Sequence, residues 1–183
     1  MRVVAGSAGG VPLETPKSDL RPTMDMVKGA IFSSLGEFVI NARVLDLFAG
    51  SGGLGIEALS RGAGPTTLVE NNRRAVETIK RNLTKTRLQG NVQEMDVFRF
   101  LDRFTTPASF DLILADPPYA KEPGDRDFGA ELLGNEWLRH AIAADGIFVL
   151  EHKPRAKLEL HGRWECIRQK RYGATELALL RPI

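Results

Sequence analysis

The chain has 183 residues, of which 43% are hydrophobic and 26% charged, and this size and balance are those of one globular domain with a hydrophobic core. Such a composition excludes disordered and fibrous classes, and the formal net charge of +2 is too small to identify a partner. We find neither a signal-peptide core nor an apolar run of the ~18 residues that a membrane span needs, so we expect a cytoplasmic protein without membrane contact. Cys166 is the single cysteine and the three histidines lack ligand spacing, so we expect no disulfide and no metal.

The first predicted element is an N-terminal hairpin or arm, residues 1–22, ahead of a catalytic core at 23–183 in the same single domain. Two short apolar runs, VVAG and VPLE, flank the turn-prone stretch 7–10. A helix follows over 24–35, since Thr23 can cap it, Asp25 lies in its first turn, and apolar residues recur at helical spacing.

From residue 43 onward, β-type runs alternate with helical ones. Predicted strands cover 44–48, 66–70, 91–95, 110–116 and 146–152, and predicted helices cover 56–62, 73–83, a short stretch near Phe98, and 131–143. This order is typical of a mostly parallel α/β sheet with helices on both faces. The last two runs, 163–173 and 174–182, meet near Gly173 and predict a C-terminal antiparallel hairpin. From Glu151 to Ile183 eight Lys or Arg stand against four Asp or Glu, which fits either a solvated face or a phosphate-binding one.

Candidate site residues follow the strands, where open α/β sheets bind their ligands. The first strand leads into Asp46-Leu47-Phe48-Ala49-Gly50-Ser51-Gly52-Gly53-Leu54-Gly55, and Glu70, Asp96 and Asp116 follow later strands. Gly50, Gly52 and Gly55 satisfy GxGxxG with Glu70 twenty residues beyond Gly50, which also fits a nicotinamide dinucleotide site. Asp46 favours a cationic ligand such as S-adenosylmethionine over a pyrophosphate. A third interpretation makes the glycines a packing feature only.

The tetrapeptide Asp116-Pro117-Pro118-Tyr119 decides between these interpretations. The lone pair of a base's exocyclic amine is delocalised into the ring, so a catalyst must accept the amine hydrogens to free it. The Asp116 carboxylate and the Pro117 carbonyl can do this, because two prolines fix the backbone and aim the carbonyl rigidly. Tyr119 can stack on a base taken out of its helix. The alternative is a strand ended by a Pro-Pro turn, with Tyr119 in the core.

These motifs resemble the RsmD family, bacterial methyltransferases of guanine N2 in small-subunit (16S) ribosomal RNA. The resemblance rests on VVAG near the start, RPTMDMVK with IF, RVLDLFAGSGGLGIEALSRGA, the pair VE and DPPY. It implies a Rossmann-like class I fold with a seven-stranded sheet, an S-adenosylmethionine cofactor, and a catalytic corner at Asp116, Pro117, Pro118 and Tyr119. It assigns the cofactor to Asp46, Phe48, Gly50, Ser51, Gly52, Glu70, Asn71, Asp96 and Val97, and the substrate to Arg21, Thr23 and Lys28.

The expected partner is ribosomal RNA, naked or within an assembling particle, bound by a monomer. Phosphate contacts are expected from Arg21, Lys28 and the basic C-terminal hairpin. Two departures stand out: Val11 and Pro12 replace the family's basic residues in the N-terminal hairpin, and the segment 120–129 matches nothing familiar. Alternatives are methylation of adenine N6 or of DNA, an NAD-dependent oxidoreductase, and a non-catalytic RNA-binding module.

Overall fold

The protein is a seven-stranded α/β sheet with the strand order β3-β2-β1-β4-β5-β7-β6. The computed structural model describes residues 1–15, 24–120, 122 and 124–183. Strands β1 to β5 run parallel, and β7 pairs antiparallel with both β5 and β6. The strands are β1 (Val44–Leu47), β2 (Thr66–Glu70), β3 (Asn91–Glu94), β4 (Phe110–Ala115), β5 (Ile142–His152), β6 (Trp164–Tyr172) and β7 (Thr175–Pro182). The mostly parallel sheet and the C-terminal antiparallel hairpin are confirmed.

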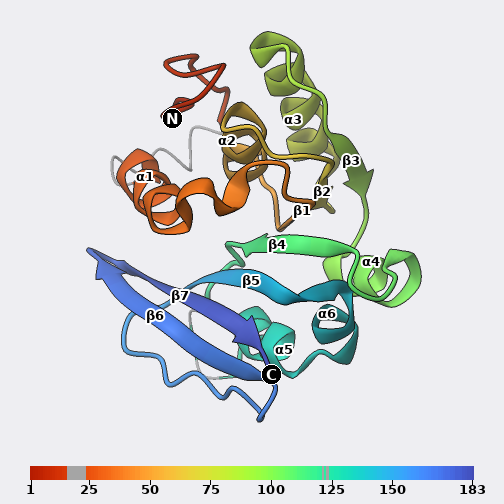
Figure 1. Ribbon diagram of the computed structural model, residues 1–183, viewed down its shortest axis with the longest axis vertical. Helices are drawn as coiled ribbons and strands as arrows, with labels where there is room; N and C mark the ends of the chain where they lie inside the picture. Colours follow the sequence, from red (N-terminus) through yellow and green to blue (C-terminus); the bar gives the residue numbers. More distant parts are fainter. Residues whose placement is uncertain (16–23, 121, 123) are drawn as a thin grey trace.

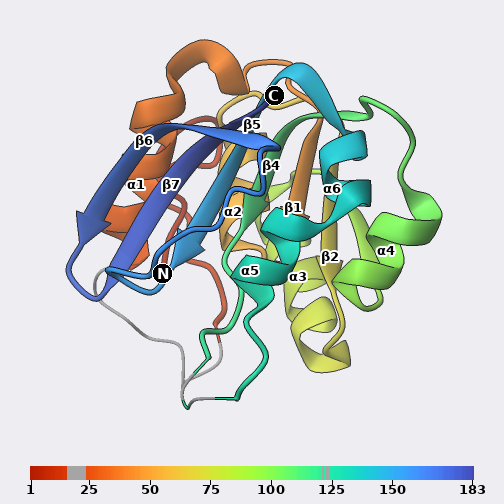
Figure 2. The ribbon, with the colours of Figure 1, turned by 90° about the horizontal axis from the view of Figure 1, so that it is seen from below.

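Helices cover both faces of this sheet, as Figures 1 and 2 show. One face carries α1 (Met24–Leu35), the 3-10 helix η2 (Gly36–Val39), α2 (Gly53–Ser60) and α3 (Arg73–Thr86). The other carries α4 (Val97–Phe104), α5 (Phe128–Gly134) and α6 (Glu136–Ala141). Within the described ranges, no helix combines the length and the apolar character needed to cross a membrane.

The core forms where the central strands are sandwiched between these layers. All four residues of β1 and the last four of β4 are buried, which explains why these runs are continuously apolar apart from Asp46. Helix α1 has the predicted bounds and packs Val27, Ile31 and Phe32 against the sheet. Its proposed cap, Thr23, lies outside the described residues.

The prediction of one continuous helix over 131–143 was wrong. The chain forms α5 and α6 instead, because Asn135 adopts an extended conformation with ψ 120° between them. Its side chain accepts a hydrogen bond from the Leu138 amide at 2.9 Å, which starts a new helix. Ile142 and Ala143 then belong to β5. The local side-chain bond at Asn135 competes with helix continuation, a choice that the apolar spacing alone does not reveal.

The N-terminal hairpin is present as a bridge between Arg2 and Pro12. Val3 and Leu13 are buried in a cluster with residues of α2 and α3. The buried Glu57 carboxylate on α2 accepts hydrogen bonds from the amides of Val4 (2.7 Å) and Ala5 (3.0 Å). The hairpin is therefore held on the same side of the sheet as α1, α2 and α3 (Figure 1).

Candidate active site

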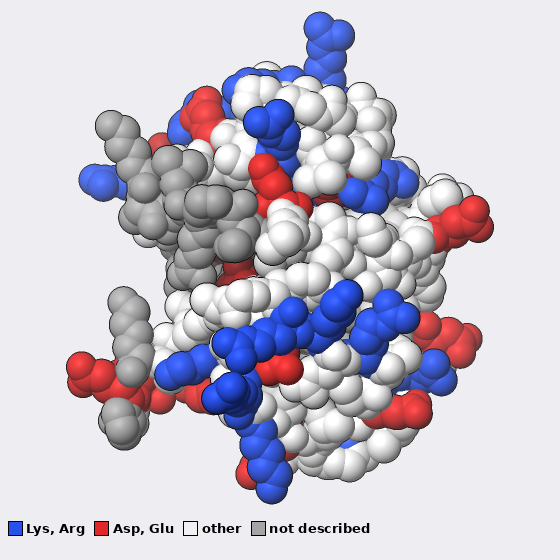
Figure 3. All heavy atoms as spheres, turned by 90° about the vertical axis from the view of Figure 1, so that its left-hand side faces the viewer, with Lys and Arg blue, Asp and Glu red and all other residues white. Residues whose placement is uncertain are grey.

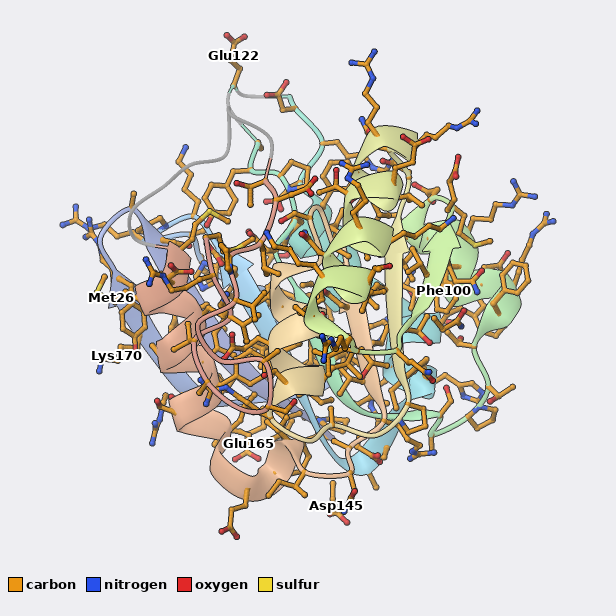
Figure 4. The ribbon with its side chains drawn as sticks, turned by 90° about the horizontal axis from the view of Figure 1, so that it is seen from above. Met26, Phe100, Glu122, Asp145, Glu165 and Lys170 are labelled. Carbon is orange, nitrogen blue, oxygen red and sulfur yellow. The ribbon has the colours of Figure 1, made fainter. Side chains whose placement is uncertain are left out.

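Strand register brings the predicted site residues to one edge of the sheet. Leu47 of β1 pairs with Ala115 of β4, and Ala115 pairs with Leu150 of β5. The residues that follow these three, namely Phe48, Asp116 and Glu151, therefore emerge side by side at the carboxyl edge, with Glu70 of β2 next to them. Figure 4 labels Glu122, just beyond Tyr119, at one end of the molecule, with Asp145 and Glu165 at the opposite end.

Asp46 is a buried carboxylate beneath the glycine loop, with only 1% of its surface exposed. Its Oδ2 accepts a hydrogen bond from the Gly55 amide at 2.8 Å. Burial raises the pKa of Asp46 to about 7, the Gly55 bond opposes this rise, and nearby Glu70 adds to it. Among the described residues, no lysine or arginine forms an ion pair with this carboxylate. A buried acid lacking a cation is suited to hold a positively charged ligand group.

The glycines of the loop are required by its shape. Gly52 precedes α2 with φ +84°, a left-handed conformation that side chains disfavour. A Cβ on Gly55 would lie 2.7 Å from Leu68 Cδ2 and 3.0 Å from Asp46 Oδ2, so a larger residue would force Leu68, the Asp46 carboxylate or the helix to move. Phe48 also has a positive φ, +59°, and strained backbone of this kind often marks functional sites.

Glu70 ties the glycine loop to the turn after β2. Its Oε2 accepts a hydrogen bond from the Gly50 amide at 2.9 Å, and its Oε1 accepts one from the Asn72 amide at 2.8 Å. Each carboxylate oxygen has a further lone pair, so both can still accept bonds from vicinal hydroxyls. Glu70 is thus held in one orientation by two backbone amides, with lone pairs left for the hydroxyl groups of a ligand.

Asn82 of α3 is a site-supporting residue that the sequence did not reveal. It is fully buried, and its Nδ2 donates to the Ser51 carbonyl at 2.9 Å, which fixes the middle of the glycine loop. Its amide group also bonds the backbone of Glu14 in both directions, at 2.8 and 2.9 Å. Asn82 therefore couples the N-terminal segment to the loop, and it lies on a helix where no local motif marks it.

The residues that follow β3 lie at the same edge of the sheet. Asp96 is exposed and caps α4 by accepting from the Arg99 amide at 3.0 Å, while Val97 is buried in the core. Asn71 is exposed directly after Glu70. Asp96, the N-cap, and Val97, the first residue of α4, thus lie at the same edge of the sheet as Glu70.

The segment after Tyr119, which the sequence left unassigned, builds an aromatic cluster beside helix α4. Phe128 lies 5.3 Å from Phe48 and 6.3 Å from Phe98 between ring centroids. The Arg126 guanidinium stands 4.8 Å above the Phe98 ring and 4.7 Å above the Phe128 ring, and Glu131 holds it through two bonds of 2.7 Å. Cation–π stacking therefore attaches this segment to Phe98 of helix α4.

The catalytic corner predicted at the end of β4 lies at the carboxyl edge of the sheet. Pro117 is buried, Asp116 and Pro118 are exposed, and Tyr119 is half-buried. The Tyr119 hydroxyl hydrogen-bonds to Thr175 Oγ1 and donates to Glu151 Oε1 at 3.3 Å. Burial, and then the nearby Glu151 charge, raise the pKa of Tyr119 above its ordinary value, so the phenol stays protonated.

The substrate-binding residues predicted near the N-terminus fare differently. Arg21 and Thr23 lie outside the described residues. Lys28 is only 3% exposed, and its ammonium pairs with Glu57 at 3.5 Å and Asp25 at 3.6 Å. Burial lowers the pKa of Lys28 although both acids act to raise it. Lys28 is thus a buried ion-pair partner, and the prediction that it contacts phosphate was wrong.

Exposed cations gather on the edge strand β6. We call Arg168, Lys170 and Arg171 the β6 cations; all three are exposed, and no carboxylate of the described chain forms an ion pair with them. Arg168 contacts Ser34 of α1 at 3.3 Å, which places the strand beside that helix. Figure 3 shows a band of basic side chains crossing this side of the molecule.

Similarity to known proteins assigns the chain to a family. The sequence model of a family described as conserved hypothetical protein 95 matches residues 1–181. The chain belongs to this family, the RsmD family.

Several members of the RsmD family and several solved structures are similar over nearly the whole chain. YlbH of Bacillus subtilis, a proposed rRNA methyltransferase, is 36% identical over 98% of this chain and 97% of its own length. Ribosomal RNA small subunit methyltransferase D of Haemophilus influenzae is 30% identical over 98% of this chain and 92% of its own. The solved structure of yhhF from Escherichia coli, a proposed methyltransferase, superimposes with a TM-score of 0.82, 29% identity, and 100% and 97% coverage.

Proposed function

We propose that this protein is an S-adenosylmethionine-dependent methyltransferase that modifies the N2 amine of a guanine in small-subunit ribosomal RNA. The observation that carries the proposal is the placement of Asp116 and Pro117 at the carboxyl edge, directly between the glycine loop and Glu151. The RsmD relatives named as small-subunit rRNA methyltransferases support this choice of substrate.

The cofactor proposal rests on the fit of the glycine-loop residues. Asp46 offers a buried negative charge for the cationic amino-acid end, and Glu70 offers two oriented oxygens for ribose hydroxyls. The remaining contacts are proposed for residues that surround these two acids: Phe48, Gly50, Ser51, Gly52, Asn71, Asp96 and Val97. A pyrophosphate would meet repulsion from Asp46, so a nicotinamide dinucleotide fits this site less well.

When bound, S-adenosylmethionine supplies an electrophilic methyl group. Asp116 and the Pro117 carbonyl accept the two hydrogens of the amine, which localises the nitrogen lone pair and aims it at that methyl. Pro117 and Pro118 remove backbone freedom from the corner, so these acceptors are preorganised. Tyr119 presents a ring face on which the flipped base can stack, which contributes about 1–3 kcal/mol. This reaction requires no covalent bond to the protein and no metal.

RNA contact is proposed through phosphates on the β6 cations. These lie on a strand whose last residue, Tyr172, pairs in register with Thr175, a direct neighbour of Tyr119. A nucleotide on Tyr119 would therefore have neighbouring phosphates near the basic edge. We further propose that the protein acts as a monomer in the bacterial cytoplasm, on naked RNA or an assembling particle.

Methyl transfer from labelled cofactor to unmethylated small-subunit rRNA, with nucleoside analysis of the product, tests this function. We expect label in N2-methylguanosine and none in matched DNA. Label in N6-methyladenosine would instead support an adenine enzyme, and label in DNA would remove the RNA assignment. Calorimetry should show binding of S-adenosylhomocysteine and none of NAD; the reverse would support an oxidoreductase.

A further inference from the structure

The hydroxyl of Tyr119 belongs to a three-residue network that reaches across the sheet. Its oxygen is in hydrogen-bond contact with Thr175 Oγ1 and lies 3.3 Å from Glu151 Oε1, and Thr175 Oγ1 donates to the same carboxylate oxygen at 2.7 Å. The carboxylate only accepts, so Thr175 donates its one hydrogen to Glu151, and the one hydrogen of the Tyr119 hydroxyl is shared between Thr175 Oγ1 and Glu151 Oε1. The three residues come from the catalytic corner, the end of β5 and the start of β7.

We propose that Thr175 and Glu151 are positioning residues that hold the Tyr119 ring in the orientation needed for base stacking during methyl transfer. This inference rests on the proposed function, because it assigns the ring to the target base. It adds two residues from the C-terminal half of the chain, where no motif pointed to the chemistry.

The hydroxyl is not needed for stacking itself. A phenylalanine ring offers the same kind of π face, so a hydroxyl at this position must serve another purpose. Tyr119 follows two prolines at a tip whose flanking residues, Pro118 and Ala120, are exposed or half-buried. Packing alone gives such a ring weak restraint, whereas bonds to two side chains on neighbouring strands define its direction.

Thr175 is itself held rigidly. It is 6% exposed and begins β7, which pairs with β5 on one side and β6 on the other. Its register partner is Tyr172, the last residue of β6. The ring of Tyr119 is consequently oriented by the hairpin that also carries the β6 cations, so the surface proposed for phosphates and the stacking platform belong to one structural unit.

Loss of this orientation should affect turnover more than binding. Methyl transfer depends on alignment of the nitrogen with the methyl group, and small misplacements of reacting atoms are costly. Thr175→Val removes the hydroxyl at nearly constant volume, and we expect kcat to fall about 10-fold with the KM for RNA within about 2-fold. Thr175→Ser keeps the hydroxyl and should restore most of the loss.

Thr66→Val is the matched control. Thr66 is 4% exposed, lies at the start of β2, far from the carboxyl edge, and donates its hydroxyl to the Gly64 carbonyl at 3.1 Å. Thr66→Val therefore removes a threonine hydroxyl from a strand position as buried as that of Thr175. We expect its kcat to match the wild type.

A double-mutant cycle connects Thr175 to Tyr119. Tyr119→Phe should lower kcat to the same degree as Thr175→Val, and the double variant should show no further loss. Glu151→Gln retains an acceptor and should lower kcat less. Wild-type kcat in Thr175→Val, or multiplicative losses in the double variant, would overturn the proposal.

A spectroscopic measurement does not depend on activity. The chain has only two tyrosines, so Tyr172→Phe protein labelled with 13C at the tyrosine Cζ gives one signal, from Tyr119. Thr175→Val should shift this signal and Thr66→Val should not; an unshifted signal in Thr175→Val would refute the network. If wild-type protein methylates no RNA, the proposed function fails, while this signal still reports whether Thr175 positions the ring.

Discussion

The two halves of the candidate site are organised in different ways. In the cofactor half, backbone amides of the site's own loops orient the acids: Gly55 bonds Asp46, while Gly50 and Asn72 bond Glu70. The other half is proposed to hold the target base, the methyl acceptor, and we call it the acceptor half. Its oriented group is Tyr119, whose hydrogen-bond partners lie 32 and 56 residues away in the sequence. The first half is thus built largely by local geometry, whereas the second depends on the completed sheet.

The largest expected effect lies at the junction of the two halves. Asp116→Ala removes an acceptor of the amine hydrogens, and we expect kcat to fall by about 10³-fold or more, as for loss of a transition-state hydrogen-bond partner. Affinity for S-adenosylhomocysteine, measured by calorimetry, should stay within about 3-fold of wild type. Loss of cofactor affinity together with turnover would place Asp116 in the cofactor half instead.

Asp46→Asn tests the cofactor half alone. We expect binding of S-adenosylhomocysteine to weaken about 10- to 100-fold, because a charged hydrogen-bond partner of the ligand's ammonium is lost. In the wild type the pKa of free Asp46 is about 7, so affinity should fall as pH drops through 7. The variant should lose this step in a calorimetric pH series; a step that persists would assign it to another group.

Asp46→Asn should weaken ligand binding but raise the stability of the ligand-free protein. The pKa of Asp46 is raised on folding from 3.8 to about 7, so its ionisation destabilises the native state as pH rises through that interval. The amide side chain of the Asp46→Asn variant cannot ionise, and this variant without ligand should resist urea better than wild type at pH 8, with a smaller gain at pH 5. Equal stability of the variant and the wild type at both pH values would show that the buried charge does not lower the stability of the native state.

Lys28→Met separates structural from RNA-binding cations. It removes one partner of buried Glu57, which keeps Arg61 at 2.7 Å, so we expect the free energy of unfolding to fall by about 2 kcal/mol. Denaturant titration measures this loss. The KM for RNA should stay unchanged, and a marked rise would return Lys28 to the substrate surface.

Loss of the β6 cations should have a smaller effect, on the KM for RNA alone. Replacing Arg168, Lys170 and Arg171 by Ala should raise the KM for RNA about 10-fold and reduce the slope of log KM against log salt by about 2, with kcat unchanged. The control removes three exposed cations from α3, at Arg74, Lys80 and Lys85. Equal effects in both variants would show a general charge effect and no specific surface.

The same contrast explains what the sequence could predict. The glycine loop and DPPY each follow a strand directly and Glu70 ends one, so strand prediction alone located them at one edge. Asn82, Thr175 and Glu151 act through contacts with distant segments, and Arg126 through stacking on another helix, and no periodicity encodes such contacts. Lys28 was misassigned because its burial depends on Glu57, 29 positions later in the chain.

Mapping of methylated nucleotides in small-subunit rRNA from cells that lack this gene tests the proposed methylation at its target. We expect that one N2-methylguanosine disappears, returns with the wild-type gene, and does not return with the Asp116→Ala gene. An unchanged set of methylated guanines in the deletion strain, or restoration by the Asp116→Ala gene, would contradict this proposal.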